Sequence, residues 1–402
     1  MHKDLSLLGR ALKIAWRSPQ IIPTLGRMEF RHRWGMARDR RLRPGYSAPP
    51  TNLAICLTLR CNLSCRMCRQ LRGGQEIPAN RIWYDRHREL DLGTWVSLLD
   101  QVAPFRPWLY VTGGEPLIYP DFQGFVQEAR RRGLAVQIQT NGTLLASVAE
   151  FLVEAGVVAV SVSLDGPPEV HDAIRGVKGA YGKLAAGAAA LVAARRKCHS
   201  PTPILGLNCT ISKGNLDFLP EVVSQAIELQ ADTLQLQHTM FNSPEKVARH
   251  NAFFTPARVR ELGLDMVFPS ICEGEYYQSE IGPEDLPRLK SGLRQARVLA
   301  KDRIKLLSMP NLPDELLDPY YLDLDYSFQE GCDFFWKTFR ISPDGTYSPC
   351  LNLKIGNIAQ EPFTEIWNGP KMRALRRLFA HHLFPGCVRC CQRHYVKGSR
   401  AF

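Results

Sequence analysis

Short apolar runs alternate with amphipathic helical patterns along the middle of the chain. The apolar runs are rich in Val, Ile and Leu and lie at residues 52–58, 108–112, 135–140, 158–164, 204–210 and 233–238. Such runs, with little strict alternation, are typical of a parallel sheet covered on both faces. Helices are predicted between them at residues 93–103, 121–132, 145–154, 181–196 and 217–229. The pattern predicts an α/β fold with a partial, TIM-like (β/α)6 barrel, whose active site lies at the carboxyl ends of the strands.

The regions outside this alternation differ in composition. Residues 1–50 form a basic N-terminal extension, and residues 51–240 form the predicted barrel. Residues 241–328 are irregular and proline-rich, which predicts a helical bridge that contacts substrate. Residues 329–402 are rich in cysteine and form a small C-terminal domain.

Composition restricts the cellular setting. The chain has 402 residues, of which 45% are apolar, so it can build a large core. It contains no apolar run of the ~18–20 residues that span a membrane and no recognisable signal peptide. Twelve cysteines without a secretory signal indicate a reducing cytoplasm and metal or redox chemistry.

Positive charge is concentrated at the start of the chain. Residues 1–50 hold eleven Lys and Arg but three Asp and Glu, whereas the net charge of the whole chain is +12. Apolar residues recur there at helical spacing, with basic residues between them: Leu5, Leu8, Leu12, Ala15 and Trp16. Two interpretations stay open: peripheral contact with a membrane surface, or a helix packed on the catalytic domain with a solvated basic face.

Three cysteines follow the first predicted strand at the spacing C-x3-C-x2-C. They are Cys61, Cys65 and Cys68. Three thiolates on one short loop can hold three irons of a cubane cluster and leave the fourth iron open for a ligand. A zinc knuckle is the alternative, although zinc usually takes four ligands arranged in C-x2-C pairs.

Polar or glycine-rich turns follow the next three strands. Gly113-Gly114-Glu115-Pro116 follows the second, and its paired glycines let the backbone approach a ligand closely. Thr140-Asn141-Gly142 follows the third, and Ser163-Leu164-Asp165-Gly166, with His171, Asp172 and Arg175 beyond it, follows the fourth. Each turn alone is also compatible with an ordinary βα connection.

Taken in this order, the motifs resemble the radical S-adenosylmethionine (radical SAM) superfamily. The resemblance covers about residues 52–240, and its one departure is Met67, where the family more often has an aromatic residue. It implies that Cys61, Cys65 and Cys68 ligate a [4Fe–4S] cluster whose open iron chelates S-adenosylmethionine. A one-electron donor such as flavodoxin or ferredoxin would reduce the cluster, and a 5′-deoxyadenosyl radical would then take a hydrogen atom from the substrate.

The resemblance also implies contacts to S-adenosylmethionine. The turn formed by Gly113, Gly114, Glu115 and Pro116 would bind the methionine amino group, with Glu115 as its charged partner. Ser163 and Arg175 would approach the carboxylate or the ribose, because a guanidinium fork matches a carboxylate. The alternative for Arg175 is a surface ion pair. Asn208 is a further candidate contact, and Gln237 and His238 are expected to face substrate. No catalytic acid, base or hydrogen donor is identified.

The C-terminal region combines a hairpin signal with returning cysteines. Asp344-Gly345 predicts a tight turn between two short strands. The region resembles the SPASM/twitch domain that follows many radical SAM barrels. That resemblance implies one auxiliary [4Fe–4S] cluster for electron transfer, held by Cys332, Cys350, Cys387 and Cys390. Cys391 is either spare or a substitute for Cys390, and a zinc site is the alternative.

The substrate class is the least determined property. The resemblance favours a peptide or protein side chain, with a small molecule or a lipid as the alternative. A non-catalytic iron–sulfur sensor or nucleic-acid binder is disfavoured, because it leaves the Gly113-Gly114-Glu115-Pro116 turn and its companion motifs unexplained.

Overall fold

The computed structural model describes residues 26, 30, 44–68, 85, 87–266, 279–326, 332–350, 353–380 and 383–390. The predicted basic helix near the N-terminus and Cys391 lie outside these residues.

One large sheet organises the protein. Its strands are β1 (Asn52–Cys56), β2 (Trp108–Thr112), β3 (Ala135–Thr140), β4 (Ala159–Ser163), β5 (Ile204–Ile211), β6 (Thr233–His238), β8 (Lys305–Met309), β9 (Thr338–Ile341), β10 (Thr346–Tyr347) and β12 (Gly356–Asn357). Their spatial order is β12-β10-β9-β1-β2-β3-β4-β5-β6-β8. All neighbouring strands from β9 to β8 pair in parallel. The strand β10 pairs antiparallel with both of its neighbours, β9 and β12. A separate pair joins β7 (Asp265–Met266) to β11 (Leu353–Lys354).

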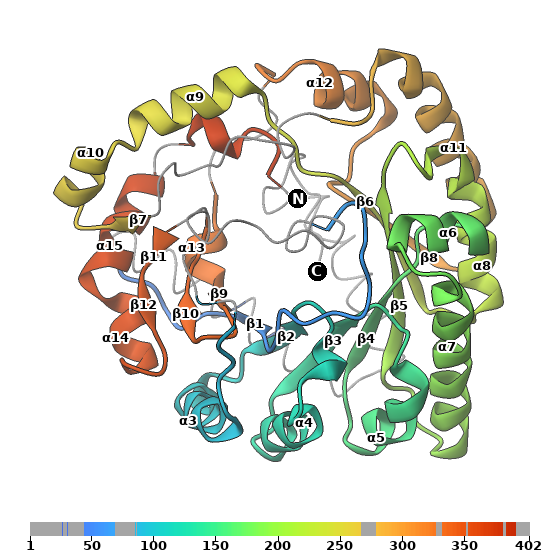
Figure 1. The fold of residues 1–402 in the computed structure, drawn as a ribbon, viewed down its shortest axis with the longest axis horizontal. Coiled ribbons are helices and arrows are strands. Elements are labelled where there is room, and N and C mark those ends of the chain that lie inside the picture. The colour runs from blue at the N-terminus through green and yellow to red at the C-terminus, as the bar shows by residue number, and fades with distance from the viewer. Residues whose placement is uncertain are drawn as a thin grey trace.

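Helices cover the outside of the parallel strands. The helices are α3 (Leu92–Val102), α4 (Phe122–Arg131), α5 (Ala149–Glu154), α6 (Pro168–Arg175), α7 (Ala180–Lys197), α8 (Leu219–Glu228), α9 (Pro244–Phe253), α10 (Pro256–Glu261), α11 (Leu286–Ala300), α12 (Leu317–Leu322), α13 (Phe334–Lys337), α14 (Phe363–Asn368) and α15 (Pro370–Phe379). The strands follow an open arc, with α3, α4, α5, α7, α8 and α11 on its outer side (Figure 1). The helices α9 and α12 lie across the ring from β1–β3. The predicted partial barrel is confirmed.

Local sequence signals begin and end several of these helices. The Asp91 side chain accepts the Thr94 N–H at 2.7 Å and caps α3. Ser243 caps α9 in the same way, with Pro244 at the first helical position. The helix α6 ends at Gly176, which is left-handed at φ 72°. The predicted helix over residues 145–154 begins as a 3-10 turn and becomes α-helical over α5.

Strand residues alternate between two environments. Leu53, Ile55, Val136 and Ile138 are fully buried beneath the helices. The opposite side faces the middle of the barrel and is mostly half-buried. We call this side the lumen face; by strand alternation and pairing register it comprises Asn52, Ala54, Cys56, Trp108, Tyr110, Thr112, Ala135, Gln137, Gln139, Ala159, Ser161, Ser163, Ile204, Gly206, Asn208, Thr210, Thr233, Gln235, Gln237, Thr338 and Arg340.

Two strands extend the sheet beyond the predicted six. The strand β8 comes from the region predicted as a helical bridge and pairs with β6. The strand β9 comes from the cysteine-rich C-terminal region and pairs with β1. Because both pairings join residues distant in sequence, the local pattern carried no signal for them. The sheet thus continues across the predicted domain boundaries, and those boundaries stay a prediction.

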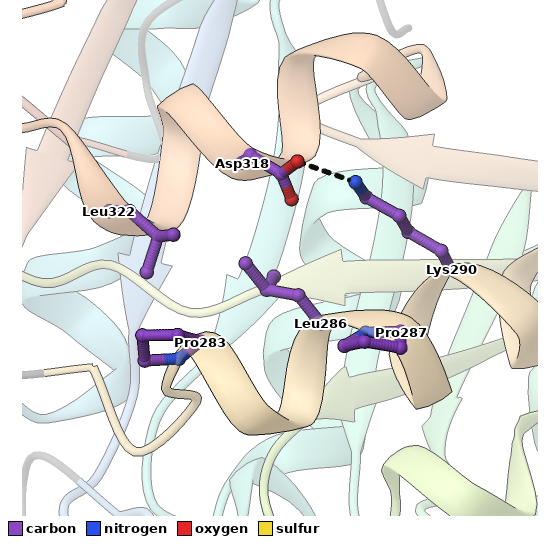
Figure 2. Close-up of a pocket in the computed structure, with 6 residues that line it drawn as sticks. All are labelled: Pro283, Leu286, Pro287, Lys290, Asp318 and Leu322. Atoms are coloured by element: carbon purple, nitrogen blue, oxygen red, sulfur yellow. Dashed lines mark hydrogen bonds and ion pairs between the residues drawn. The ribbon is translucent and has the colours of Figure 1, made fainter.

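Figure 2 shows a surface pocket of about 410 Å³ between the start of α11 and α12. Its lining includes the Lys290–Asp318 ion pair at 2.7 Å and none of the predicted site residues. Among the described residues, no helix has both the length and the apolar character needed to cross a bilayer.

Candidate functional site

The three cysteines lie on the loop that follows β1, at the predicted end of the barrel. Cys65 is buried, and Cys61 and Cys68 are half-buried. The loop packs in a small apolar cluster with Leu63, Met67, Val177 and Ala180. Burial raises the pKa of the Cys61 and Cys65 thiols. Their thiolate forms therefore depend on N–H donors or on a bound metal.

The glycine turn after β2 is joined to the backbone of the cysteine loop. Gly114 donates its N–H to the Thr58 carbonyl at 2.8 Å, and Glu115 donates to the Arg60 carbonyl at 2.8 Å. A Cβ at Gly113 (φ +154°) would lie 2.3 Å from the Thr58 oxygen, and one at Gly114 2.3 Å from the Arg60 oxygen. These glycines therefore allow two backbone segments to meet, and the close approach they permit is to the cysteine loop itself.

The Glu115 side chain is enclosed by protein rather than presented to a ligand. It is fully buried and accepts hydrogen bonds from the Thr140 hydroxyl at 2.8 Å and the Asn141 N–H at 2.7 Å. A third bond comes from the Leu117 N–H at 3.1 Å. Burial raises the pKa of Glu115, and these hydrogen bonds oppose the rise. The carboxylate joins the turn after β2 to the turn after β3, and the charged-partner role expected for this side chain stays a prediction.

The turn after β3 holds the cysteine loop from a second side. The Asn141 side chain donates to the side-chain Oδ1 of Asn62 at 2.9 Å and to the Cys61 sulfur at 3.9 Å. Asn62 in turn donates to the Thr143 hydroxyl at 2.8 Å.

The end of α6 holds the loop from a third side. Ser64 and Arg66 donate their N–H groups to the carbonyls of Arg175 and Ile174, at 3.2 Å and 3.0 Å. A Cβ at Gly176 would lie 2.5 Å from the Ser64 oxygen, so glycine is required where the helix ends. All three strand-end motifs therefore meet at the cysteine loop.

Arg175 forms an ion pair, and that pair is buried. Its guanidinium contacts the Asp165 carboxylate at 2.5 Å and donates to the Cys65 sulfur at 3.7 Å. The alternative considered for Arg175 was a surface pair, but Asp165 is fully buried and Arg175 is 12% exposed. Arg175 opposes the rise in the pKa of Cys65 that burial causes. The Arg175 Nε–H has no hydrogen-bond partner among the described residues.

Ser163 and Asn208 meet through Gln139 on the lumen face. The Asn208 side chain donates to the side-chain Oε1 of Gln139 at 2.8 Å, and the Gln139 side-chain NH₂ donates to the Ser163 hydroxyl at 3.4 Å. The Tyr110 hydroxyl adds a bond to Gln139 at 3.2 Å. Gln237 shares this face, whereas His238 is buried on the other side and contacts the Tyr321 hydroxyl at 2.7 Å. The expectation that His238 faces substrate is corrected.

Two of the C-terminal cysteines flank the predicted hairpin along the chain. The strands β9 and β10 pair antiparallel, and Gly345 in the turn has φ 87°. Cys332 precedes the hairpin, and Cys350 follows it. Cys387 lies in a 3-10 turn (Pro385–Cys387), and the Cys390 N–H bonds to the Cys387 carbonyl at 3.3 Å.

Buried polar residues hold the Cys387–Cys390 segment. The His250 Nδ1 accepts the Gly386 N–H at 3.2 Å. Arg389 is 1% exposed, and its guanidinium donates to backbone carbonyls at the end of α12, including Tyr320 at 2.6 Å and Pro319 at 2.9 Å. The segment is thereby attached to residues from the middle of the chain.

Comparison with protein families agrees with this geometry. Residues 55–208 match the radical SAM superfamily, and residues 332–391 match SPASM, an iron–sulfur cluster-binding domain. The chain is a radical SAM enzyme with a SPASM domain.

Relatives of this radical SAM enzyme span most of its length. An AdoMet-dependent heme synthase of Methanosarcina barkeri is 29% identical over 88% of this chain and 91% of the relative. A PqqA peptide cyclase of Ruegeria pomeroyi is 28% identical over 86% of this chain and 80% of the relative. The fold is shared with Streptococcus suis SuiB bound to S-adenosylmethionine, with a TM-score of 0.58 at 15% identity over 86% of this chain and 71% of that one.

The two domains imply a [4Fe–4S] cluster with S-adenosylmethionine, and auxiliary iron–sulfur in the SPASM domain. The cysteine loop fits a cluster, because Cys61 and Cys65 each accept an N–H···S bond of the kind that tunes thiolate ligands. In the part of the chain that the structure describes, no three His, Cys, Asp or Glu side chains are grouped to hold one metal ion. A cubane takes each thiolate on a separate iron and needs no such convergence.

Sequence reasoning missed several residues of this site. The cysteine loop is also held by Thr58 and Thr143, which lie outside the quoted motifs, and by Asn62, which occupies an unspecified position of the C-x3-C-x2-C spacing. Tyr110 and Gln139 carry the lumen-face network from the middle of strands. A polar residue at a lumen position of an otherwise apolar strand was the available signal.

Proposed function

We propose that this radical SAM enzyme takes a hydrogen atom from a peptide or protein side chain. Cys61, Cys65 and Cys68 would hold the [4Fe–4S] cluster, which with S-adenosylmethionine supplies a 5′-deoxyadenosyl radical. The observation that carries this assignment is the attachment of the cysteine loop to three strand-end motifs. Those attachments hold the ligands in place before the cluster binds.

The proposed contacts to S-adenosylmethionine follow from which groups remain accessible. The backbone of Gly113, Gly114, Glu115 and Pro116 would meet the methionine amino group, since the Glu115 side chain is fully buried. Ser163 and Asn208 would contribute from the lumen face. Arg175 would hold Cys65 through Nη1, and its unpartnered Nε–H is the donor left for a bound group.

The SPASM domain would hold one auxiliary [4Fe–4S] cluster through Cys332, Cys350, Cys387 and Cys390. With all its irons ligated by protein, this cluster would carry an electron rather than bind substrate. An external one-electron donor, such as flavodoxin or ferredoxin, would supply the reducing electron.

Two observations support a peptide substrate. The relative from Ruegeria pomeroyi is a PqqA peptide cyclase and matches this chain over most of both lengths. The lumen face offers hydroxyl and amide groups that both donate and accept, including Tyr110, Gln139, Ser163 and Asn208. Peptide groups require such paired donors and acceptors.

A small-molecule substrate is the second candidate. The relative from Methanosarcina barkeri is an AdoMet-dependent heme synthase, and it covers slightly more of this chain than the peptide cyclase does. A tetrapyrrole would present its carboxylates and an apolar ring to the same barrel.

The test compares the two substrate classes on one preparation. The anaerobically reconstituted, reduced enzyme is incubated with a pool of synthetic peptides and, separately, with iron-coproporphyrin III. We expect peptides from the pool to increase 5′-deoxyadenosine formation and to change in mass. Stimulation by the tetrapyrrole alone would contradict the peptide proposal and support the second candidate.

The matched control removes only the first cluster. The triple variant Cys61→Ala, Cys65→Ala, Cys68→Ala should form no 5′-deoxyadenosine but retain the iron and the absorption of the auxiliary cluster. A triple variant with no residual iron would contradict the two-cluster assignment.

A further inference from the structure

The strand β9 places one arginine on the lumen face. In the parallel pair β1–β9, Arg340 lies opposite Ala54. Its neighbours Phe339 and Ile341 are fully buried on the other side, where Phe339 packs against Phe363 at a centroid distance of 4.9 Å. Since successive side chains alternate across a strand, Arg340 points toward the barrel interior.

Arg340 is exposed and unpaired. Its side chain has no hydrogen bond or ion pair with any described residue. Two other arginines near the carboxyl ends of the strands are paired: Arg60 contacts Glu89 at 2.8 Å, and Arg175 contacts Asp165 at 2.5 Å. An unpaired guanidinium stays well hydrated and keeps its five donors available.

The surroundings of Arg340 belong to the cysteine-loop end of the barrel. Burial raises the pKa of Cys56, the last residue of β1, to about 12, and the positive charge of Arg340 opposes this rise. The acids that also act on Cys56 are engaged elsewhere. Glu89 pairs with Arg60, and Asp344 accepts hydrogen bonds from Thr346.

The rest of the lumen face carries no compensating charge. Over β1–β6 and β9 the lumen positions of the described structure hold no Asp, Glu or Lys, and Arg340 is their single arginine. Over β1–β6 and β9 the interior therefore combines neutral polar groups with one cation on β9, and a second cation, Lys305, lies opposite Thr233 at the start of β8. A ligand that matches this face has neutral hydrogen-bonding groups and one anionic group.

We propose that Arg340 binds a carboxylate of the substrate and thereby selects acidic substrates and sets their orientation in the barrel. The proposal rests on the proposed function in one respect, that the substrate occupies the lumen. The planar guanidinium forms two parallel hydrogen bonds with a carboxylate, which fixes orientation as well as affinity. The carboxylate can belong to an acidic peptide or to a small carboxylic acid, and the two sources are separated below.

The first test does not depend on substrate identity. Reconstituted enzyme is treated with phenylglyoxal, and modification of Arg340 is followed by mass spectrometry of its peptide. Glutarate should slow modification of Arg340 several-fold more than neutral glutaramide does, and inorganic phosphate should protect less than glutarate. Arg303, an exposed arginine just before β8, serves as the internal control and should react equally in all samples. Equal protection by glutarate and glutaramide would overturn the proposal, and stronger protection by phosphate would replace the carboxylate with a phosphate group.

The second test identifies the source of the carboxylate. Wild-type enzyme and the variants R340Q and R340K are used for affinity selection from a synthetic peptide pool. The wild type should enrich peptides containing Asp or Glu roughly tenfold or more over R340Q, as expected for the loss of a charged hydrogen bond, with R340K in between. Equal enrichment of acidic peptides by wild type and R340Q would overturn the role of Arg340. If no peptide is enriched while glutarate still protects Arg340, the peptide proposal fails and the carboxylate belongs to a small molecule.

Discussion

The buried carboxylate of Glu115 accepts the backbone N–H of Asn141 at 2.7 Å, and this bond connects the turns after β2 and β3. Asn141 then donates its side-chain amide to Asn62 and Cys61. Glu115 and Asn141, which belong to separate motifs in the sequence, therefore act together to hold the loop at Cys61.

Glu115→Gln should weaken this support. The amide replaces one acceptor oxygen with an NH₂ group that faces N–H and O–H donors, so at least one buried hydrogen bond is lost. We expect a loss of about 1–3 kcal/mol in the free energy of unfolding and a lower iron content after reconstitution. Urea unfolding of the apoprotein and iron analysis measure the two effects. Glu154→Gln, at an exposed position on α5, should change stability by less than about 0.5 kcal/mol. Equal stability of the two variants would contradict the structural role of Glu115.

Gly113→Ala should disrupt the junction between the glycine turn and the cysteine loop. The new Cβ would lie 2.3 Å from the Thr58 carbonyl oxygen, in a backbone conformation that side chains rarely adopt. A destabilisation of about 2–4 kcal/mol is expected, together with loss of cluster assembly. The matched change Gly182→Ala meets nothing within 4 Å in α7 and should stabilise by about 0.5–1 kcal/mol. Thermal melts and the cluster absorption distinguish the two, and a functional cluster in Gly113→Ala would count against the steric argument.

Breaking the Asp165–Arg175 pair should be costly because both charges are largely buried. Asp165→Asn and Arg175→Gln should each destabilise by about 3–5 kcal/mol. The double variant should lose about 1–3 kcal/mol less than the sum, which a double-mutant cycle by urea unfolding measures. Lys197→Gln breaks a pair with Glu150 in which both side chains are more than 60% exposed, and it should cost less than about 1 kcal/mol. Simple additivity of the two buried variants would show that the charges do not interact.

Acid should destabilise the apoprotein partly through His238. Burial lowers the pKa of His238 from 6.5 to about 3, so the folded protein keeps this ring neutral while the unfolded chain protonates it. The unfolded state binds more protons between pH 6.5 and about 3, and stability therefore falls as the pH is lowered through this window. The slope from this group approaches about 1.4 kcal/mol per pH unit.

The measurement is urea unfolding at several pH values for wild type and His238→Gln. The variant should lose part of the pH slope while being less stable at pH 7, because the contact with the Tyr321 hydroxyl changes. His87→Gln, at an exposed position, should keep the wild-type slope. An unchanged slope in His238→Gln would show that other groups cause the acid sensitivity.

The sequence by itself determined the elements that depend on local patterns. Six strands, the C-x3-C-x2-C loop after the first of them and the turn at Gly345 follow from short-range periodicity and turn chemistry, and each lies where it was predicted. The radical SAM and SPASM families could also be predicted from the sequence, because the spacing of the thiols and the glycine turns are local features.

Only the tertiary structure decided which groups are free to act. Glu115 and Arg175 carry charged groups that could bind a ligand. However, other residues of the protein, Asn141 and Asp165 among them, occupy most of their hydrogen-bonding capacity. Conversely, Arg340 belongs to no recognised motif. It becomes a candidate ligand-binding residue only because β9 pairs with β1, which places the unpaired Arg340 side chain inside the barrel. Strand pairing between distant segments sets burial, and burial decides whether a polar side chain supports the site or faces the substrate.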